Sequence, residues 1–175
     1  MRPRLERVAT RVRQARAADA AAIARIHNQG IADRVATFET DQRSAADVER
    51  ALAERGSRYP TVVVEHEGAV LAWAAASLYR SRTCYAGIGE FSVYVAREAR
   101  GRGLGRIAME ALISASERSG LWKLVSRIFP ENAASLALCR SLGFREVGTY
   151  GRHARLDGEW KDVVIVEKLI GEAAE

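Results

Sequence analysis

The stretch that decides the fold runs from Glu90 to Gly105 and reads EFSVYVAREARGRGLG. Its first six residues are mostly β-branched or aromatic, which predicts a strand. Three glycines follow within Arg100–Gly105, and the next residues predict a helix. The apolar positions with helical spacing are Leu104, Ile107, Ala108, Ala111, Leu112 and Ala115. The segment therefore predicts a strand, a glycine loop and a helix in succession.

A glycine loop in this position can hold a phosphate group. The first N–H groups of a helix have no partner inside the helix, and the helix dipole adds about half a positive charge there. Glycine lets an anion approach the backbone closely, and Arg100, Arg102 and Arg106 would supply charged donors around it. Ordinary capping or turn chemistry would explain the glycines equally well if the loop stood alone. The spacing matches neither the dinucleotide pattern Gly-x-Gly-x-x-Gly nor a P-loop.

Composition narrows the class of protein and partner. A chain of 175 residues is the size of one domain, and no apolar run approaches the ~18 residues that would cross a bilayer. The net charge of +5 favours anionic partners. No segment combines dense basic residues with interleaved aromatics, so a polyphosphate-bearing cofactor is a better candidate than nucleic acid.

The two ends of the chain and its cysteines set further expectations. Residues 1–14 are rich in Arg but lack the apolar stretch of a secretory signal. We expect residues 1–11 to be a flexible basic tail and residues 12–171 to form one domain. The only cysteines, Cys84 and Cys139, are too few for a disulfide framework or a four-ligand zinc site, which favours a reducing, cytoplasmic location and no metal.

The rest of the chain alternates between helical and strand patterns. A helix is expected from Asp19 to about Gly30, and a second one follows the capping segment at Ser44 and ends near Gly56. Glu67-Gly68 separates two β-rich runs and predicts a hairpin. A short helix capped by Asn132 is expected to end at Gly143. The remaining strands are expected at residues 61–65, 70–74, 123–128, 144–150 and 160–169.

Two ordered motifs resemble the signatures of the GNAT superfamily of N-acetyltransferases. Arg100, Gly103 and Gly105, placed after Val-Tyr-Val, resemble its Arg/Gln-x-x-Gly-x-Gly/Ala loop. Asn132-Ala-Ala-Ser-Leu, followed by Leu-Gly-Phe at 142–144, resembles its second signature. The resemblance implies a single α/β (α+β) domain with a mixed, mostly antiparallel central sheet of about seven strands, flanking helices and a splayed acetyl-CoA cleft.

The resemblance also implies which residues bind acetyl-CoA. In the family the glycine loop grips the pyrophosphate, and the asparagine contacts the pantetheine arm, a role that is compatible with a plain N-cap at Asn132. Backbone N–H groups near Val93 to Val95 would polarise the thioester carbonyl. The implied cofactor residues are Val93, Tyr94, Val95, Arg100, Gly101, Arg102, Gly103, Leu104, Gly105, Arg106, Asn132 and Ser135.

Further segments resemble the branch of phosphinothricin, arsinothricin and methionine-sulfoximine N-acetyltransferases. These are Ala36–Thr40, the strand Glu90–Val95 and the closing Gly158–Val163. The branch implies a small amino-acid-like acceptor, a homodimer and a role in detoxification or resistance. It also implies that Glu90 is the general base, although a glutamate at a strand end is usually a solvated charge.

The proton donor to the leaving thiolate is not apparent from the sequence. Cys139 stands where many relatives have tyrosine or histidine. A cysteine in a helix can equally be a small buried hydrophobe, and the CoA thiolate is a tolerable leaving group without an acid. His153 is expected on the surface.

The resemblance places the acceptor pocket between the predicted hairpin and the Glu90 strand. Two arginines there suit an acceptor with acidic groups, because guanidinium forks bind oxyanions in two-point fashion. A solvated basic loop is the alternative for the arginines, and ordinary core packing is the alternative for the aromatic residues. The candidate acceptor residues are Phe38, Glu39, Arg80, Arg82, Tyr85 and Trp160.

Three rival functions remain open from the sequence. A peptide or protein N-terminal acetyltransferase would use the same loop with an open groove. A regulatory module would bind CoA without catalysing a reaction. The presence of Glu90 and of the complete glycine loop argues against this function. A basic nucleic-acid-binding protein would show strongly salt-dependent affinity, and no motif supports it.

Overall fold

Seven strands form one mixed sheet in the computed structural model, which describes residues 10–174. Their order is β1-β2-β3-β4-β5-β7-β6, and all neighbours run antiparallel except β4 and β5. This confirms the predicted fold class. The strands are β1 (Thr10–Gln14), β2 (Thr61–His66), β3 (Ala69–Leu78), β4 (Ile88–Val95), β5 (Lys123–Ile128), β6 (Arg145–Leu156) and β7 (Glu159–Leu169).

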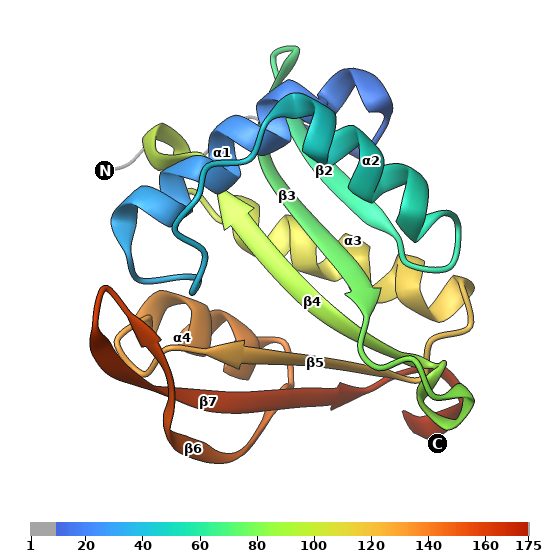
Figure 1. The fold of residues 1–175 in the computed structure, drawn as a ribbon. Coiled ribbons are helices and arrows are strands. Elements are labelled where there is room, and N and C mark those ends of the chain that lie inside the picture. The colour runs from blue at the N-terminus through green and yellow to red at the C-terminus, as the bar shows by residue number, and fades with distance from the viewer. Residues whose placement is uncertain (1–9, 175) are drawn as a thin grey trace.

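Helices cover both faces of this sheet (Figure 1). α1 and α2 pack against each other, and α1 contacts β3 and β4, whereas α3 packs across β2, β3 and β4 from the other face. Among residues 10–174, no helix has both the length and the apolar character that crossing a bilayer requires. The α-helices are α1 (Ala20–Asp33), α2 (Ala45–Arg55), α3 (Leu104–Arg118) and α4 (Ala133–Ser141).

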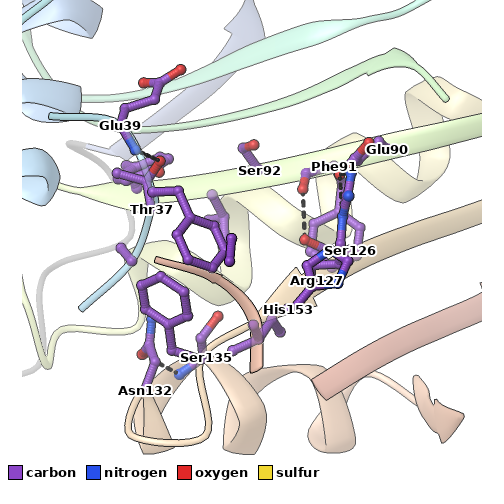
Figure 2. A pocket seen from close by; sticks show the side chains of 17 residues that line it. Thr37, Glu39, Glu90, Phe91, Ser92, Ser126, Arg127, Asn132, Ser135 and His153 are labelled. Atoms are coloured by element: carbon purple, nitrogen blue, oxygen red, sulfur yellow. Dashed lines mark hydrogen bonds and ion pairs between the residues drawn. The ribbon is translucent and has the colours of Figure 1, made fainter. Parts of the chain in front are cut away.

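The parallel strands β4 and β5 pair at one end only. Their register joins Ile88 to Lys123 and Glu90 to Val125, and it stops there although β4 continues to Val95. Figure 1 shows the two strands diverging beyond this point. Side chains from both strands line the space between them (Figure 2). The predicted opening in the sheet is therefore present.

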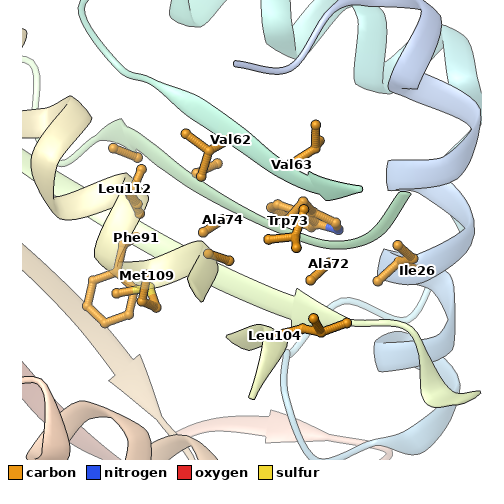
Figure 3. Packing of buried hydrophobic residues seen from close by; sticks show 14 of the residues in the cluster. Ile26, Val62, Val63, Ala72, Trp73, Ala74, Phe91, Leu104, Met109 and Leu112 are labelled. Atoms are coloured by element: carbon orange, nitrogen blue, oxygen red, sulfur yellow. The ribbon is translucent and has the colours of Figure 1, made fainter. Parts of the chain in front are cut away.

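The main core lies between the central strands and the helices α1 and α3 (Figure 3). The β3 strand carries small alanines at its centre, which allow helices to approach closely on both faces. α3 buries Leu104, Met109 and Leu112 against this sheet. Burial of a side chain of this size contributes about 1.5–3 kcal/mol, so this apolar stripe fixes α3 and with it the glycine loop at its start.

α1 continues past Gly30, where the sequence predicts a stop. The helix ends at Asp33, and Arg34 closes it in the left-handed conformation with φ of 57°. A Cβ at Gly30 would lie 2.5 Å from Cε1 of Tyr94. The missing side chain therefore makes room for the Tyr94 ring and does not end the helix.

The expected flexible tail, residues 1–11, overlaps β1. Thr10 and Arg11 pair with β2 residues, while residues 1–9 lie outside the described part of the chain. Arg13 fastens this strand by donating to Asp19 at 2.7 Å and to Glu65 at 3.0 Å. Charged residues on an edge strand commonly protect a sheet against edge-to-edge association. Because β1 is polar, it lacks the apolar pattern from which the other strands are predicted.

The closing hairpin is longer than the sequence predicts, because β6 extends to Leu156. Its pairing with β7 shifts register between Glu146 and Gly148 and again between Tyr150 and Ala154. Such bulges interrupt the alternation of side chains that marks a strand in a sequence. Leu156 joins Phe129 and Val163 in a second, smaller cluster of buried residues.

Candidate functional site

The open edge of β4 presents backbone polar groups to the gap between β4 and β5. The Ser126 hydroxyl donates to the carbonyl of Phe91 at 3.0 Å, and Arg100 donates to the carbonyl of Val95 at 3.3 Å. Both carbonyls thus point into the gap. Since every second residue of a strand turns its N–H and C=O to the same side, those of Val93 point there too. No strand within residues 10–174 pairs with β4 beyond Glu90 on this side, so the Val93 N–H can donate to a ligand.

A hollow of about 440 Å³ lies beside the glycine loop at the start of α3. We call it the glycine-loop hollow. It brings together the predicted cofactor residues except Arg102, which is exposed and does not line it. These lining residues are Val93, Tyr94, Val95, Arg100, Gly101, Gly103, Leu104, Gly105, Arg106, Asn132 and Ser135.

The start of α3 leaves its first N–H groups without partners. Gly103 is the N-cap, with φ of 82° and no side chain to cap the helix. The first helical bond runs from the Ile107 N–H to the Gly103 carbonyl at 3.2 Å. The N–H groups of Leu104, Gly105 and Arg106 therefore lack acceptors within the helix. A Cβ on Gly103 would meet nothing within 4 Å, so this end of the helix is open to an anion.

Two of the loop arginines are already bound to protein groups. Arg100 pairs with Asp33 at 2.7 Å. Arg106 donates to Glu110 at 2.8 Å and to the carbonyl of Ser141 at 3.2 Å. Each guanidinium has five N–H donors, so donors for a ligand remain. The helix N-terminus is thus the more direct source of anion donors, and these arginines also brace the loop.

A second hollow, of about 450 Å³, lies between β4 and β5 (Figure 2). We call it the central hollow. Its walls are residues 36–39, residues 90–94 of β4, residues 126–128 of β5 with Phe129 after it, and His153 and Ala154 of β6. His153 is exposed, as predicted, but it also borders this hollow. The residues shared with the glycine-loop hollow are Ala36, Val93, Tyr94, Asn132 and Ser135.

Asn132 faces both hollows and caps α4. Its Oδ1 accepts from the Ser135 N–H at 3.2 Å, and its NH₂ group has no protein acceptor within residues 10–174. Cys139 of the same helix is 1% exposed, lines none of the hollows described here, and burial raises its pKa to about 11. This environment favours the packing interpretation of Cys139 over that of a proton donor.

Glu90 lies where β4 and β5 separate, on the wall of the central hollow. Its Oε1 accepts from Nη2 of Arg127 at 2.5 Å and from Nε at 3.1 Å. Arg127 belongs to β5 and carries no motif, so sequence reasoning does not single it out; only the pairing of β4 with β5 brings it to Glu90. The Glu90 side chain is 26% exposed, so it can take a proton from a group in the hollow directly or through water.

Glu39 also lies on the wall of the central hollow, but its carboxylate is bound to the protein. It accepts from Nε2 of His27 at 2.5 Å and from the Arg43 guanidinium. His27 is buried, and its ring lies 4.8 Å from that of Tyr94 and 5.8 Å from that of Trp73. The His27 bond, followed by the Arg43 bond, lowers the pKa of Glu39 to about 2. Glu39 thus stays ionised and ties residues 36–43 to α1.

Replacing Glu39 by Gln should flatten the acid dependence of stability. Folding lowers the pKa of Glu39 from 4.5 to about 2, so its ionised form stabilises the fold above pH 4.5, and this contribution disappears as the pH falls through about 2. Over that interval the free energy of unfolding should therefore fall more steeply for the wild type than for Glu39→Gln. Urea unfolding at several pH values measures both slopes. Glu110→Gln, which removes an exposed carboxylate paired with Arg106, is the control, and an equal flattening there would contradict the assignment.

A third hollow, of about 500 Å³, lies on the other side of Glu90. We call it the outer hollow. The predicted acceptor residues Arg80 and Tyr85 line it together with Tyr79, whose ring lies 5.2 Å from the Arg80 guanidinium and 5.9 Å from the Tyr85 ring. Glu90, Ser126 and Arg127 border both this hollow and the central one. These three side chains thus lie at the boundary between the two spaces.

The structure does not gather all the predicted acceptor residues. Phe38 lines the central hollow and packs edge-on against Phe129, with ring centres 4.8 Å apart. Arg82 and Trp160 line none of the three hollows described among residues 10–174. Trp160 is 51% exposed on β7, where the Arg155 guanidinium lies 4.4 Å from its ring. It lies in the exposed first part of β7, where it pairs with Arg155 of β6.

The geometry suits a long anionic ligand beside a second, smaller one. The α3 N-terminus can hold an anion, the free edge of β4 leads from there into the central hollow, and a carboxylate lies at its far wall. Among residues 10–174, His, Cys, Asp and Glu form no group of three that could hold a metal ion. The polar groups present are suited to proton transfer and anion binding.

Comparison with known proteins agrees with this geometry. The model of the Acetyltransferase (GNAT) family matches residues 23–144. The chain is 34% identical to the L-amino acid N-acyltransferase MnaT of Escherichia coli over 94% of its length and 96% of that protein. It is 33% identical to the L-methionine sulfoximine/L-methionine sulfone acetyltransferase of Salmonella typhimurium, over 93% of its length and 96% of that protein.

Solved structures show the same similarity. A phosphinothricin acetyltransferase (Pat) from Sinorhizobium meliloti, in complex with AcCoA, superposes with a TM-score of 0.84 at 33% identity, covering 94% of this chain and 90% of that one. A ribosomal-protein-alanine N-acetyltransferase from Brucella melitensis superposes with a TM-score of 0.88 at 32% identity, covering 91% and 99%.

Proposed function

This chain belongs to the GNAT family of acetyltransferases, and we propose that it acetylates the primary amine of a small amino-acid-like acceptor. It is an acetyl-CoA-dependent N-acetyltransferase. The observation that carries the proposal is the meeting of the glycine-loop hollow with the central hollow along the free edge of β4. One hollow suits the cofactor's phosphates, and the other suits the acceptor.

The proposed cofactor contacts follow from the open donors of the site. Acetyl-CoA supplies the acetyl group as a thioester. The N–H groups at the start of α3 would bind its pyrophosphate, and the Asn132 amide would bind its pantetheine arm. The Val93 N–H would donate to the thioester carbonyl oxygen. This hydrogen bond would strengthen as negative charge develops on that oxygen during the reaction.

Glu90 is the proposed base. An amine with a pKa about two units above the pH is unprotonated only ~1% of the time, which costs about 2.7 kcal/mol. Glu90 faces the central hollow and would take this proton directly or through water. No acid is assigned, because the CoA thiolate is a tolerable leaving group and Cys139 is buried in the core.

The proposed acceptors are phosphinothricin, arsinothricin or methionine sulfoximine. The similarity to proteins named for methionine sulfoximine and phosphinothricin supports this class, and so does the position of Arg80 in the outer hollow. Acetylation would remove the charge of the amine, so we propose a detoxification or resistance role. The alternative acceptor is a peptide or protein N-terminus. The similarity to the Brucella protein, which is named for acetylating an alanine of a ribosomal protein, supports this alternative.

We further propose a homodimer in the cytoplasm. Val147 and Tyr150 are exposed apolar side chains on the rim of the outer hollow, a surface that a second copy could cover. The unpaired thiols Cys84 and Cys139 suit a reducing compartment.

A thiol-release assay with acetyl-CoA tests the proposed function. The acceptor panel comprises phosphinothricin, arsinothricin, methionine sulfoximine, polyamines and short peptides. We expect turnover with at least one amino-acid analogue, and CoA at 100 times its Kd should stabilise the fold by ~2.7 kcal/mol in thermal unfolding. Turnover of peptides alone would identify a protein N-terminal acetyltransferase. CoA stabilisation without turnover of any amine would indicate a regulatory CoA-binding module.

A further inference from the structure

Arg127 occupies the boundary between the central and outer hollows. Its side chain is 46% exposed, and it borders both spaces together with Glu90 and Ser126. The hydrogen bonds of its side chain within residues 10–174 go to one atom, Oε1 of Glu90. Of the five N–H donors of its guanidinium, two are used there, and the others can reach a ligand.

The Arg127–Glu90 pair is one that a ligand can open. Exposed ion pairs contribute little to stability, because water solvates both partners well. Arg100 differs, since it is held both by Asp33 and by the Val95 carbonyl. An anionic group that enters the central hollow can therefore take the place of Glu90 on Arg127 at low cost.

The shape of an α-amino acid decides what that group is. Its amine and its α-carboxylate are attached to the same carbon, so the protein group that binds the carboxylate must lie beside the base that deprotonates the amine. Arg127 touches Glu90, whereas Arg80 stacks beside Tyr79 in the outer hollow. The two arginines thus suit two acidic groups at different distances from the amine.

We infer that Arg127 binds the α-carboxylate of the acceptor and, by exchanging partners, releases Glu90 to act as the base. This inference rests on the proposed function. On acceptor binding, the Arg127 guanidinium donates to the acceptor carboxylate in two-point fashion. The Glu90 carboxylate, now unpaired, takes one proton from the acceptor ammonium: an N–H bond breaks, an O–H bond forms, and the neutral amine keeps its electron pair for attack. Arg80 is left for the polar group at the far end of the acceptor side chain.

A comparison of each acceptor with its α-carboxamide tests Arg127. The probe is whichever of phosphinothricin, arsinothricin and methionine sulfoximine the wild type acetylates fastest. We expect the wild type to prefer the carboxylate by about ten- to a hundred-fold in kcat/KM, the usual contribution of one charge-assisted contact. In Arg127→Gln this preference should fall by at least about tenfold. The amide also changes the amine pKa, but equally for every variant, so the ratios remain comparable.

Matched variants separate Arg127 from the alternatives. Arg140→Gln removes another exposed arginine paired with a glutamate, Glu146, and should leave the preference unchanged. Arg80→Gln should also leave it unchanged, while Arg127→Lys should retain part of it. An unchanged preference in Arg127→Gln, or its loss in Arg80→Gln, would overturn the inference. If thermal unfolding shows that Arg127→Gln does not fold, full retention of the preference by Arg127→Lys would overturn it instead. Absence of turnover of every amine by the wild type would mark failure of the proposed function itself.

Discussion

Gly103→Glu should abolish acetyl-CoA binding while leaving the fold intact. Gly103 stands at the uncapped start of α3, where a side chain would project into open space beside the unpartnered N–H groups. A glutamate there would place its own carboxylate among the donors that we assign to the pyrophosphate, and its charge would repel the cofactor. Loss of two charge-assisted bonds of about 1.5–3 kcal/mol each predicts a Kd for CoA weakened at least 100-fold. Calorimetric titration with CoA measures the change.

Two controls separate the binding effect from backbone strain. Gly103 has φ of 82°, a conformation that costs any other residue about 1–2 kcal/mol. Gly103→Ala introduces this strain without the carboxylate and should weaken CoA binding far less. Gly56→Glu makes the same change at another positive-φ glycine with open space around it, at the end of α2. If folded Gly103→Glu binds CoA as tightly as Gly56→Glu does, the pyrophosphate must bind elsewhere.

Local elements of this fold are readable from the sequence because their signals lie within a few residues. The hairpin at Glu67-Gly68 is present, with both residues at positive φ as its turn requires. Ser44 caps α2 by accepting from the Asp47 N–H at 3.1 Å, as its capping segment predicts. The glycine loop also precedes α3 as expected, and its neighbours assemble the glycine-loop hollow.

The parts that the sequence does not reveal depend on contacts between distant segments. Arg127 meets Glu90 only because β5 pairs with the first half of β4, and no spacing in the sequence encodes that register. His27 is one lone histidine on an apolar helix face until the fold places Glu39 against it. Gly30 resembles a helix stop, and its packing role appears only when Tyr94 is placed beside it. Each of these residues is explained by tertiary packing, which overrides local propensity.

Glu90→Gln should lower kcat at neutral pH by about 10²–10⁴-fold, the usual contribution of a general base. The amide has nearly the shape of the carboxylate, and its oxygen can still accept from Arg127, so the wall of the central hollow should keep its form. The loss should shrink as the pH rises toward the pKa of the acceptor amine, because the amine then loses its proton without help. Steady-state kinetics from neutral to alkaline pH measures this recovery.

The partition between kcat and binding tests whether Glu90 acts as a base or only as a partner of Arg127. A base makes its contribution in the transition state, so Glu90→Gln should leave the affinity for CoA unchanged and alter kcat far more than the acceptor KM. Arg127→Gln should show the opposite partition, with its main effect on the acceptor KM. A pH-independent loss of rate in Glu90→Gln, accompanied by the same rise in acceptor KM as in Arg127→Gln, would reduce Glu90 to a positioning residue. The proton would then have to leave the amine by way of solvent, since the buried Cys139 lies outside the hollows described among residues 10–174.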